Sequence, residues 1–527
     1  MAKRPAAPES HSGDRGGVLE IGGRPLRLAE VLAAAKGELQ VALHDEPAQR
    51  ERLLASQRAI QHQLEAGRSI YGVTTGVGAA VENQVPEALW RDLPRQLLRF
   101  HGCGTGRILG ETEAAAVVVV RLASLARGHS GVRPLVLERL CEILNLRLLP
   151  RIPEEGSVGA SGDLTPLSYV AALLVGEREV TYHGRVQTAV EALSDACLPP
   201  LELAPKESLA LMNGTSVMTA LGCIAWEHAV RLARLASALT AVVCETTHGN
   251  PGHFDARIFD WKPHPGSRRC ASWIRSDLEG DGVRSRAPAR LQDRYSLRCA
   301  PQVIGVVVDA AEQAERILEI EVNSANDNPL VDPDTGEILH GGNFYGGHVC
   351  FAMDGLKAAV AGIADLLDRQ LPLLCSPETS DGLPANLVAA EGDEAVINHG
   401  FKAMQISASA LAAEAQKLTM PAAAFSRSTE SHNQDKVSMG TIAARDCLRI
   451  QELSETVAAI SVLACCQAVD LREARGEAPG LRAAELRNAV RKSIPQLRSD
   501  RRQDHDIEQV LQMHRAGSLP MGELDGE

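Results

Sequence analysis

The stretch IQELSETVAAISVLA (residues 450–464) decides the fold, because its apolar residues recur at alternating steps of three and four. That spacing places them on one face of a helix and is typical of helices that pack in bundles. They are Ile450, Leu453, Val457, Ile460 and Ala464. The stretch VIGVVVDAAEQAERI (303–317) has the same spacing, and residues 346–373 and 395–418 are rich in Ala and Leu with few helix breakers. We therefore expect a central bundle of long helices.

The composition agrees with a mostly α fold. Of the 527 residues 45% are hydrophobic but only 3% are aromatic, so the core is expected to consist of Ala, Val, Leu and Ile. Ala and Leu have high helix propensity, whereas sheet cores draw more on aromatic residues. A chain of this length is expected to form roughly two to four domain-sized units.

The pattern along the chain predicts four regions. A polar, Gly/Pro-rich tail (1–18) is expected to be disordered, and a loop-rich N-terminal domain follows (19–225). The long-helix bundle is expected over residues 226–490, and a charged extension over 491–527. Within these regions we expect helices at 28–43 and 111–148, a loop at 150–169 that leads into a helix from about Pro166, and an irregular surface excursion at 262–291.

Charge and cysteine usage argue against several classes of protein. The net charge of −13 argues against a general nucleic-acid surface, which needs a basic field. The 12 cysteines form no CxxC pair and no Cys/His zinc spacing, so no metal is expected. We see neither a secretory signal nor an apolar stretch long and clean enough to span a membrane. The sequence therefore predicts a reduced, cytoplasmic, soluble protein that binds neither nucleic acid nor membrane.

Polar residues gather in short islands between the helical stretches. The sequence contains no GxSxG, HExxH or GxxxxGK[ST] motif and no credible dinucleotide fingerprint. Islands rich in Gly, amides and lone charges, beside long apolar helices, are expected to converge on one site. They are YGVTTGVG (71–78), GSVGASGDLTPL (156–167), LMNGTS (211–216), QDRYSLRC (292–299), NSANDNP (323–329), HGGNF (340–344) and ESHNQDK (430–436).

The most unusual island contains Ala160-Ser161-Gly162, followed by Asp163. One interpretation is a tight loop in which Asp163 caps the next helix. The other is backbone cyclisation, in which the amide nitrogen of Gly162 attacks the carbonyl of Ala160. Loss of water, and then of the Ser161 hydroxyl, would leave 4-methylideneimidazol-5-one. That group is an electrophile, which ordinary side chains do not provide.

Together these motifs resemble the histidine, phenylalanine and tyrosine ammonia-lyases and the related 2,3-aminomutases. The resemblance spans roughly residues 19–475 and includes QDRYSLRCAPQ, NDNPLV and NQDKVSMG in a compatible order. It implies a mostly α-helical homotetramer whose active sites are each built from several subunits. It also implies a 4-methylideneimidazol-5-one formed from residues 160–162, without a metal or nucleotide, and an aromatic amino acid as substrate.

The resemblance also implies roles for individual residues. Tyr71 would remove the β-proton, for which a phenol with an ordinary pKa near 10 must be ionised. Arg298 would bind the substrate carboxylate as a fork. Asn213 and Tyr295 would hydrogen-bond the prosthetic group or the amino-acid portion of the substrate. The remaining implied contacts are second-line amides and a wall of the pocket: Gln292, Asn343, Gln434 and Phe344.

The identity of the aromatic substrate stays open at this stage. The selectivity pair aligns with Phe100 and His101, of which Phe resembles the phenylalanine enzymes and His the histidine enzymes. Glu414 matches a glutamate that contacts imidazole in the histidine lyases. In contrast, GTS (214–216) and GGNFYGGH (341–348) depart from those lyases, and HGGNF with the following glycines looks more like bacterial tyrosine lyases.

A buried Glu–His pair would favour a ring with hydrogen-bonding nitrogens, because an apolar ring leaves that pair unsatisfied. We therefore narrowly favour histidine elimination to a trans-α,β-unsaturated acid. Tyrosine or phenylalanine lyase activity and aminomutase activity are the alternatives. A non-catalytic structural homologue is a more distant alternative, against which the presence of the catalytic residues argues.

Overall fold

The computed structural model describes residues 17–279 and 287–523. Apart from its last two residues, the expected disordered tail lies outside the described part of the chain. The chain forms two compact units, and each combines three separate segments, whereas the predicted domains are consecutive. The first unit comprises Met1–Cys223, Ile317–Cys350 and Ala423–Ile442; the second comprises Ile224–Arg316, Phe351–Ala422 and Ala443–Glu527.

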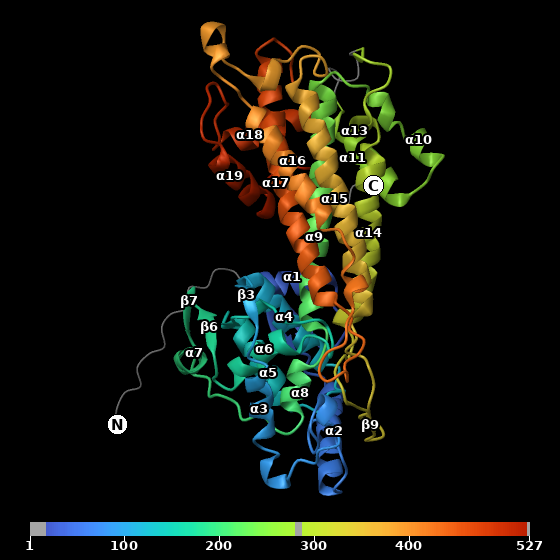
Figure 1. Cartoon of the computed structure of the whole chain (residues 1–527), viewed down its shortest axis with the longest axis vertical. Coiled ribbons are helices and arrows are strands. Elements are labelled where there is room, and N and C mark those ends of the chain that lie inside the picture. Colours follow the sequence, from blue (N-terminus) through green and yellow to red (C-terminus); the bar gives the residue numbers. More distant parts are fainter. Residues whose placement is uncertain (1–16, 280–286, 524–527) are drawn as a thin grey trace. The chain divides into compact units, whose positions relative to one another are not determined.

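The second unit is a bundle of long helices that run side by side (Figure 1). Side chains connect the neighbours: Gln370 donates to Thr240 at 2.9 Å, and Gln451 donates to the carbonyl oxygen of Ala225. All five residues of the face predicted within 450–464 are buried, and the mostly α fold is confirmed. The helices of the bundle are α9 (Ser216–Thr246), α14 (Ala300–Val322), α15 (Gly347–Cys375), α16 (Lys402–Lys417) and α17 (Gly440–Glu473), and α9, α14, α15 and α17 extend into the first unit.

Helix α17 differs from the expectation that no stretch is apolar enough to cross a membrane. By length and composition alone α17 is apolar enough to cross a membrane, but 89% of its most apolar 18-residue window is buried within the protein. A helix that other helices cover on nearly all sides needs apolar residues around its whole circumference. Its composition therefore follows from its central place in the bundle.

The first unit contains shorter helices and small strand pairs around helix α4 (Glu111–Leu125). The expected helix at 28–43 is corrected: the helix ends at Lys36, where Gly37 adopts a left-handed conformation (φ +79°), and a strand parallel to β1 (Val18–Ile21) follows. The expected helical region 111–148 is confirmed as two helices. The elements are β1 (Val18–Ile21), α1 (Leu28–Lys36), β2 (Gln40–Leu43), α2 (Pro47–Glu65), α3 (Leu93–Phe100), α4 (Glu111–Leu125), α5 (Pro134–Asn145), α6 (Leu164–Leu174), α7 (Ala189–Asp195) and α8 (Glu207–Met212).

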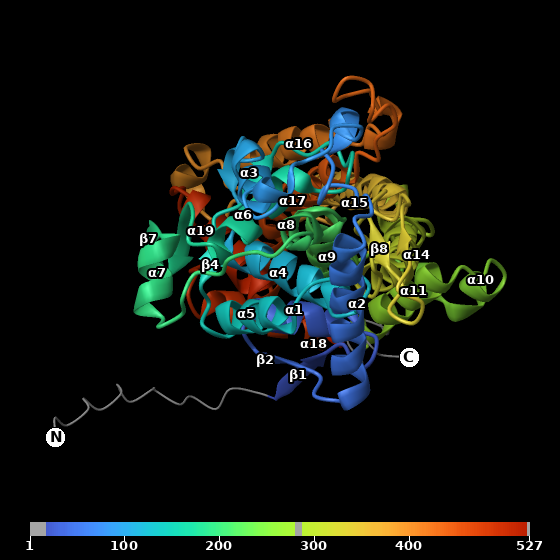
Figure 2. The ribbon, with the colours of Figure 1, turned by 90° about the horizontal axis from the view of Figure 1, so that it is seen from below.

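Short strands join these helices. Strand β3 (Thr105–Ile108) pairs antiparallel with β5 (Pro153–Glu155), and β8 (Leu330–Val331) pairs antiparallel with β9 (Ile338–Leu339). A three-stranded sheet has the order β4 (Leu149–Pro150), β6 (Glu179–Tyr182), β7 (Arg185–Thr188). Helix α4 lies beside α1 and α5 (Figure 2), and its residues from Ala114 to Leu125 are buried.

The predicted irregular excursion at 262–291 is wrong for residues 265–277, and its residues 280–286 lie outside the described part of the chain. Helix α11 (Pro265–Asp277) occupies it, because Cys270, Trp273 and Ile274 recur on one face and are buried. The short helix α10 (Ala256–Asp260) precedes it, and α13 (Tyr295–Arg298) follows.

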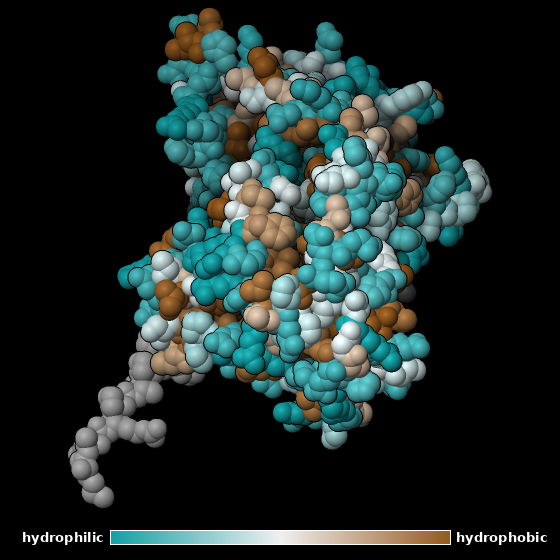
Figure 3. All heavy atoms as spheres, turned by 60° about the horizontal axis from the view of Figure 1, so that its bottom comes forward, coloured by the Kyte–Doolittle hydropathy of each residue, from teal (hydrophilic) through white to brown (hydrophobic). Residues whose placement is uncertain are grey.

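The charged C-terminal extension is ordered within the described residues. It follows α18 (Leu481–Arg491) and contains α19 (Asp504–Arg515). Arg515 of α19 forms a 3.0 Å ion pair with the buried Glu455 of α17. On the face shown in Figure 3, apolar side chains lie in small groups among polar ones.

Truncation of the bundle core is expected to destabilise the second unit strongly. Ile460→Ala removes a fully buried side chain from α17 and should lower the free energy of unfolding by about 2–5 kcal/mol. The exposed Glu452→Ala on the same helix should change it by less than about 1 kcal/mol. Denaturant unfolding monitored by circular dichroism measures both, and equal effects would contradict the assigned core face.

Candidate active site

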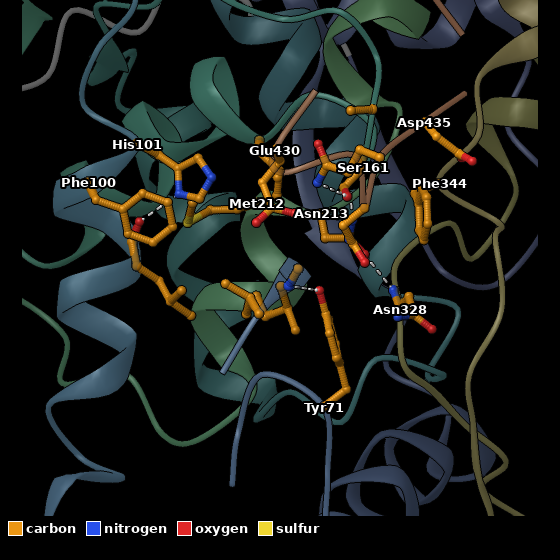
Figure 4. Close-up of a pocket in the computed structure, with 18 of the residues that line it drawn as sticks. Tyr71, Phe100, His101, Ser161, Met212, Asn213, Asn328, Phe344, Glu430 and Asp435 are labelled. Atoms are coloured by element: carbon orange, nitrogen blue, oxygen red, sulfur yellow. Dashed lines mark hydrogen bonds between the residues drawn. The ribbon is translucent and has the colours of Figure 1, made fainter. Parts of the chain in front are cut away.

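The first unit contains a cavity of about 460 Å³ lined by residues from several of the polar islands. Figure 4 shows Phe100 and His101 on one side of it, Phe344 on the other, and Ser161 and Asn213 between them. The predicted site residues that line it are Tyr71, Phe100, His101, Ala160, Ser161, Asn213, Phe344 and Gln434.

The loop before α6 is pressed against the chain at Gly214. Gly162 has φ +70°, and a Cβ there would overlap the carbonyl oxygen of Gly214. That same oxygen accepts a 2.7 Å hydrogen bond from the backbone N–H of Asp163. Only glycine combines this backbone conformation with such a close approach. The backbone at Ser161 and Gly162 is therefore confined to a narrow set of conformations.

Asp163 anchors this loop, but not as the cap of its own helix. Its carboxylate makes no capping bond to α6; it accepts bonds of 3.0 and 2.9 Å from the N–H groups of Val217 and Met218 in the first turn of α9. The Thr441 hydroxyl also donates to it. Burial raises the pKa of Asp163, and these hydrogen bonds oppose the rise. The alternative interpretation of Asp163 as a local cap is thus replaced by a tertiary anchor at a helix N-terminus.

Asn213 connects the loop to the rest of the cavity. Its side-chain nitrogen donates to the carbonyl oxygen of Ser161 at 2.7 Å, and its side-chain oxygen accepts from the backbone N–H of Asn328 at 2.6 Å (Figure 4). Gln434 donates to the Ser161 hydroxyl at 3.1 Å. The amide of Asn213 is thereby oriented, and a directed donor points at the Ser161 carbonyl.

Tyr71 lies in the cavity wall with its hydroxyl near the loop that follows it. The N–H of Gly78 donates to the Tyr71 oxygen at 2.8 Å. Burial raises the pKa of Tyr71; the bond from Gly78 lowers it, and the negative charge of Glu430 raises it further. Both carboxylate oxygens of Glu430 lie 3.1 Å from the N–H of Ala79, so this residue also holds the tyrosine loop.

The turn that carries Glu430 has an unusual backbone. Glu430, Ser431 and His432 all have φ between +49° and +62°, a conformation that non-glycine residues rarely adopt. Thr429 and Gln434 close the turn with reciprocal backbone bonds of 3.0 and 3.3 Å. Glu430 and Gln434 both line the cavity as a result.

His101 presents a hydrogen-bond acceptor to the cavity. Its Nδ1 lies 2.9 Å from the carbonyl oxygen of Leu97, and since a carbonyl only accepts, Nδ1 carries the proton. Burial lowers the pKa of His101, the hydrogen bond to Leu97 opposes this, and the nearby positive charge of Arg178 lowers the pKa further, so the site favours the neutral ring. In a neutral ring the remaining nitrogen, Nε2, is an acceptor.

Several predicted residues do not line this cavity. Gln292, Tyr295, Arg298 and Glu414 belong to the second unit. Tyr295 is 72% exposed, with the Arg298 guanidinium 4.6 Å from its ring centre, and Glu414 pairs with Arg449 at 2.9 Å. Asn343 belongs to the first unit, but its side chain donates to the carbonyl oxygen of Ala325 at 3.2 Å and is exposed.

Other residues of the cavity were not singled out from the sequence. The island 430–436 contains four of them, Asn433 included, but only its Gln434 was selected there. The sequence does not show whether a charged side chain in a short loop points into a cavity or into solvent. The lining residues missed in this way include Met212, Asn328, Glu430, Asp435 and Lys436.

Comparison with known proteins agrees with this geometry. A sequence model described as aromatic amino acid lyase matches residues 26–492. The histidine ammonia-lyase of Sorangium cellulosum (strain So ce56) is 39% identical over 507 residues, which cover 94% of this chain and 97% of that protein. Among solved structures, the tyrosine aminomutase of Streptomyces globisporus is similar with a TM-score of 0.89 at 36% identity, covering 95% of this chain and 97% of that one. The histidine ammonia-lyase of Trypanosoma cruzi follows with a TM-score of 0.86 at 31% identity, covering 96% and 94%.

The helical fold and these relatives define the protein as a carbon–nitrogen lyase. The chain belongs to the aromatic amino acid lyase family. Both statements confirm what the motifs predict.

Removal of the charge on Glu430 should shift the pH dependence of activity. That charge raises the pKa of Tyr71, so Glu430→Gln should lower it and move the rising limb of the pH–rate profile to lower pH. Glutamine retains an oxygen that can accept from Ala79. The control is Glu82→Gln, an exposed residue of the same loop, which should leave the profile in place. An unchanged or opposite shift for Glu430→Gln would contradict this electrostatic coupling.

Proposed function

We propose that this enzyme eliminates ammonia from an aromatic L-amino acid, narrowly favouring histidine, and releases the trans-α,β-unsaturated acid. The observation that carries the proposal is the placement of Tyr71, Asn213 and the confined loop 160–162 around one cavity. The base and the proposed electrophile precursor are thus within reach of one bound molecule.

The residues of the loop fit a 4-methylideneimidazol-5-one formed from Ala160, Ser161 and Gly162. Ring closure needs the Gly162 nitrogen close to the Ala160 carbonyl, and the left-handed, unbranched Gly162 held against Gly214 supports that compression. Asn213 donates to the Ser161 carbonyl oxygen, where negative charge would accumulate. The group, once formed, supplies an electrophilic carbon to the cavity.

Tyr71 acts as the base toward the β-proton of the substrate. The Gly78 N–H stabilises the phenolate oxygen, whereas burial and Glu430 oppose ionisation. Phe344 and Phe100 provide apolar surface for an aromatic ring on either side of the cavity (Figure 4).

The carboxylate-binding role of Arg298 and the hydrogen-bonding role of Tyr295 require a second copy of the chain in this proposal. The high exposure of Tyr295, an amphipathic aromatic residue, supports its use between copies of a homotetramer. Gln292 and Glu414 belong to the same second unit, so their proposed substrate contacts depend on assembly as well. The free thiols of all 12 cysteines support a reducing, cytoplasmic location.

His101 supports a substrate ring that carries a hydrogen-bond donor. Its Nε2 can accept from the N–H of an imidazole or the O–H of a phenol, whereas a phenyl ring would leave it unpaired. The histidine ammonia-lyase relatives support the first choice, and the similar tyrosine aminomutase structure supports the second. Histidine is therefore proposed, with tyrosine lyase or aminomutase activity as the alternative.

Ser161→Ala tests the electrophile. The wild-type chain should have a mass two waters below that of its sequence, and the variant should lack this deficit and lose at least ~1,000-fold in kcat, because no side chain replaces the group. The control is Ser194→Ala, an exposed serine of the same unit, which should keep both mass deficit and activity. Full activity of Ser161→Ala would refute the proposal.

His101→Leu tests the recognition of the ring. Loss of the acceptor should lower kcat/KM for the preferred donor-bearing substrate by about 10- to 100-fold and change that for phenylalanine far less. Rates for histidine, tyrosine and phenylalanine, with product identification, measure this. A wild-type enzyme that prefers phenylalanine would overturn the role of His101.

A further inference from the structure

Helix α4 carries an arginine that is fully buried behind the active-site loop. The Arg121 guanidinium donates from Nη1 to the carbonyl oxygen of Asn213 at 2.8 Å and from Nη2 to the Ser124 hydroxyl at 2.9 Å. Another buried arginine, Arg234, pairs directly with Asp277 at 2.7 and 2.9 Å. Arg121 makes no such ion pair among the described residues. Its charge-assisted bond goes to a backbone carbonyl of the active site instead.

A directed chain of hydrogen bonds continues from this cation. A guanidinium only donates, so the Ser124 oxygen accepts from Arg121, and its own proton goes to the Asn326 side-chain oxygen at 3.1 Å. The Asn326 nitrogen donates to the Thr215 hydroxyl at 2.9 Å, which donates to the carboxylate of Glu321. The buried cation is thereby linked to the carboxyl group of Glu321 through three uncharged groups, the side chains of Ser124, Asn326 and Thr215.

Gly214 makes the approach of Arg121 possible. It has φ +142°, and a Cβ at this position would overlap Nη1 of Arg121 and the side-chain oxygen of Asn326. The carbonyl oxygen of Gly214 accepts from the N–H of Asp163. The segment 213–214 is therefore held by Arg121 on one side and confines the loop 160–163 on the other.

We propose that Arg121 is a positioning residue that holds the segment 213–214, and with it the amide of Asn213, against the loop 160–162. This inference rests on the proposed function, because the loop is the precursor of the electrophile. Without the guanidinium, the Asn213 carbonyl loses its donor in a buried site, and the peptide reorients to recover one. The Asn213 side chain then no longer points at the Ser161 carbonyl, and the compression at Gly162 relaxes.

Arg121→Met tests this role, because methionine fills part of the volume without a donor. It should leave a measurable fraction of chains without the two-water mass deficit, and kcat should fall at least ~10-fold with a smaller change in KM. The control is Arg139→Met on α5, which removes another buried arginine. Arg139 donates to the carbonyl oxygen of Pro199 and pairs with Glu142 at 2.7 Å, and none of these residues lines the cavity. That variant should lose thermal stability but keep the complete mass deficit and a kcat within about twofold of wild type.

Ser124→Ala provides a second variant if Arg121→Met does not fold. It removes one acceptor of the guanidinium and the link to Asn326 while leaving the cation in place. A kcat about two- to fivefold below wild type is expected, since one hydrogen bond contributes about 1 kcal/mol. Wild-type kcat in Ser124→Ala would overturn the inference.

The mass of the wild-type chain separates this inference from the proposed function. If the wild type lacks the two-water deficit, the proposed electrophile fails whatever Arg121 does. If the wild type shows the deficit and Arg121→Met matches it in mass and kcat, the role of Arg121 alone fails. Equal loss of the mass deficit in Arg139→Met would also overturn the role of Arg121. The removal of any buried arginine would then impair formation of the electrophile.

Discussion

The site depends on the close approach of two backbone segments, residues 160–163 and 213–214. Gly162 fits against the Gly214 carbonyl only because it lacks a Cβ, and the Asp163 N–H bonds that same carbonyl. Two backbone segments in direct contact leave no room for water between them and restrict the conformations that either segment can adopt. Asn213, at the end of α8, is thereby positioned to donate a hydrogen bond to the Ser161 carbonyl oxygen.

Buried charged residues hold the segments 160–163 and 213–214 together, and each charge is compensated in a different way. Asp163 is stabilised by the first-turn N–H groups of α9, where the helix dipole favours an anion. Lys206 and Asp327 pair directly, both with fully buried side chains, and Asp327 precedes Asn328, whose N–H orients Asn213. Unpaired charges in such a place would cost several kcal/mol each, so the network tolerates few rearrangements.

The sequence predicted the bundle from its local period, and many of the cavity residues from motifs that resemble those of the aromatic amino acid lyases. Ile460 and its neighbours repeat with the helical period, and Ser161 belongs to a motif whose residues are contiguous. Local patterns say less about residues whose surroundings depend on distant partners. Glu414 was chosen for its position in a motif, and no local pattern indicates the ion pair that it forms with Arg449 of the helix bundle. Glu430 was passed over, although three successive left-handed residues bring its turn to the cavity.

The sequence by itself determined a mostly α fold, the family and the motif from which the electrophile is proposed to form. These follow from periodicity and from short contiguous segments, which the chain carries whatever its conformation. Only the tertiary structure decided which face of each polar island meets the cavity, which nitrogen of His101 is an acceptor, and that Asp163 caps α9 and not α6. The bonds of Asp163 join residues 54 and 55 positions apart. The bond of His101 to Leu97 spans only four positions, but it depends on how the ring is turned within the folded cavity wall, and no local pattern specifies that.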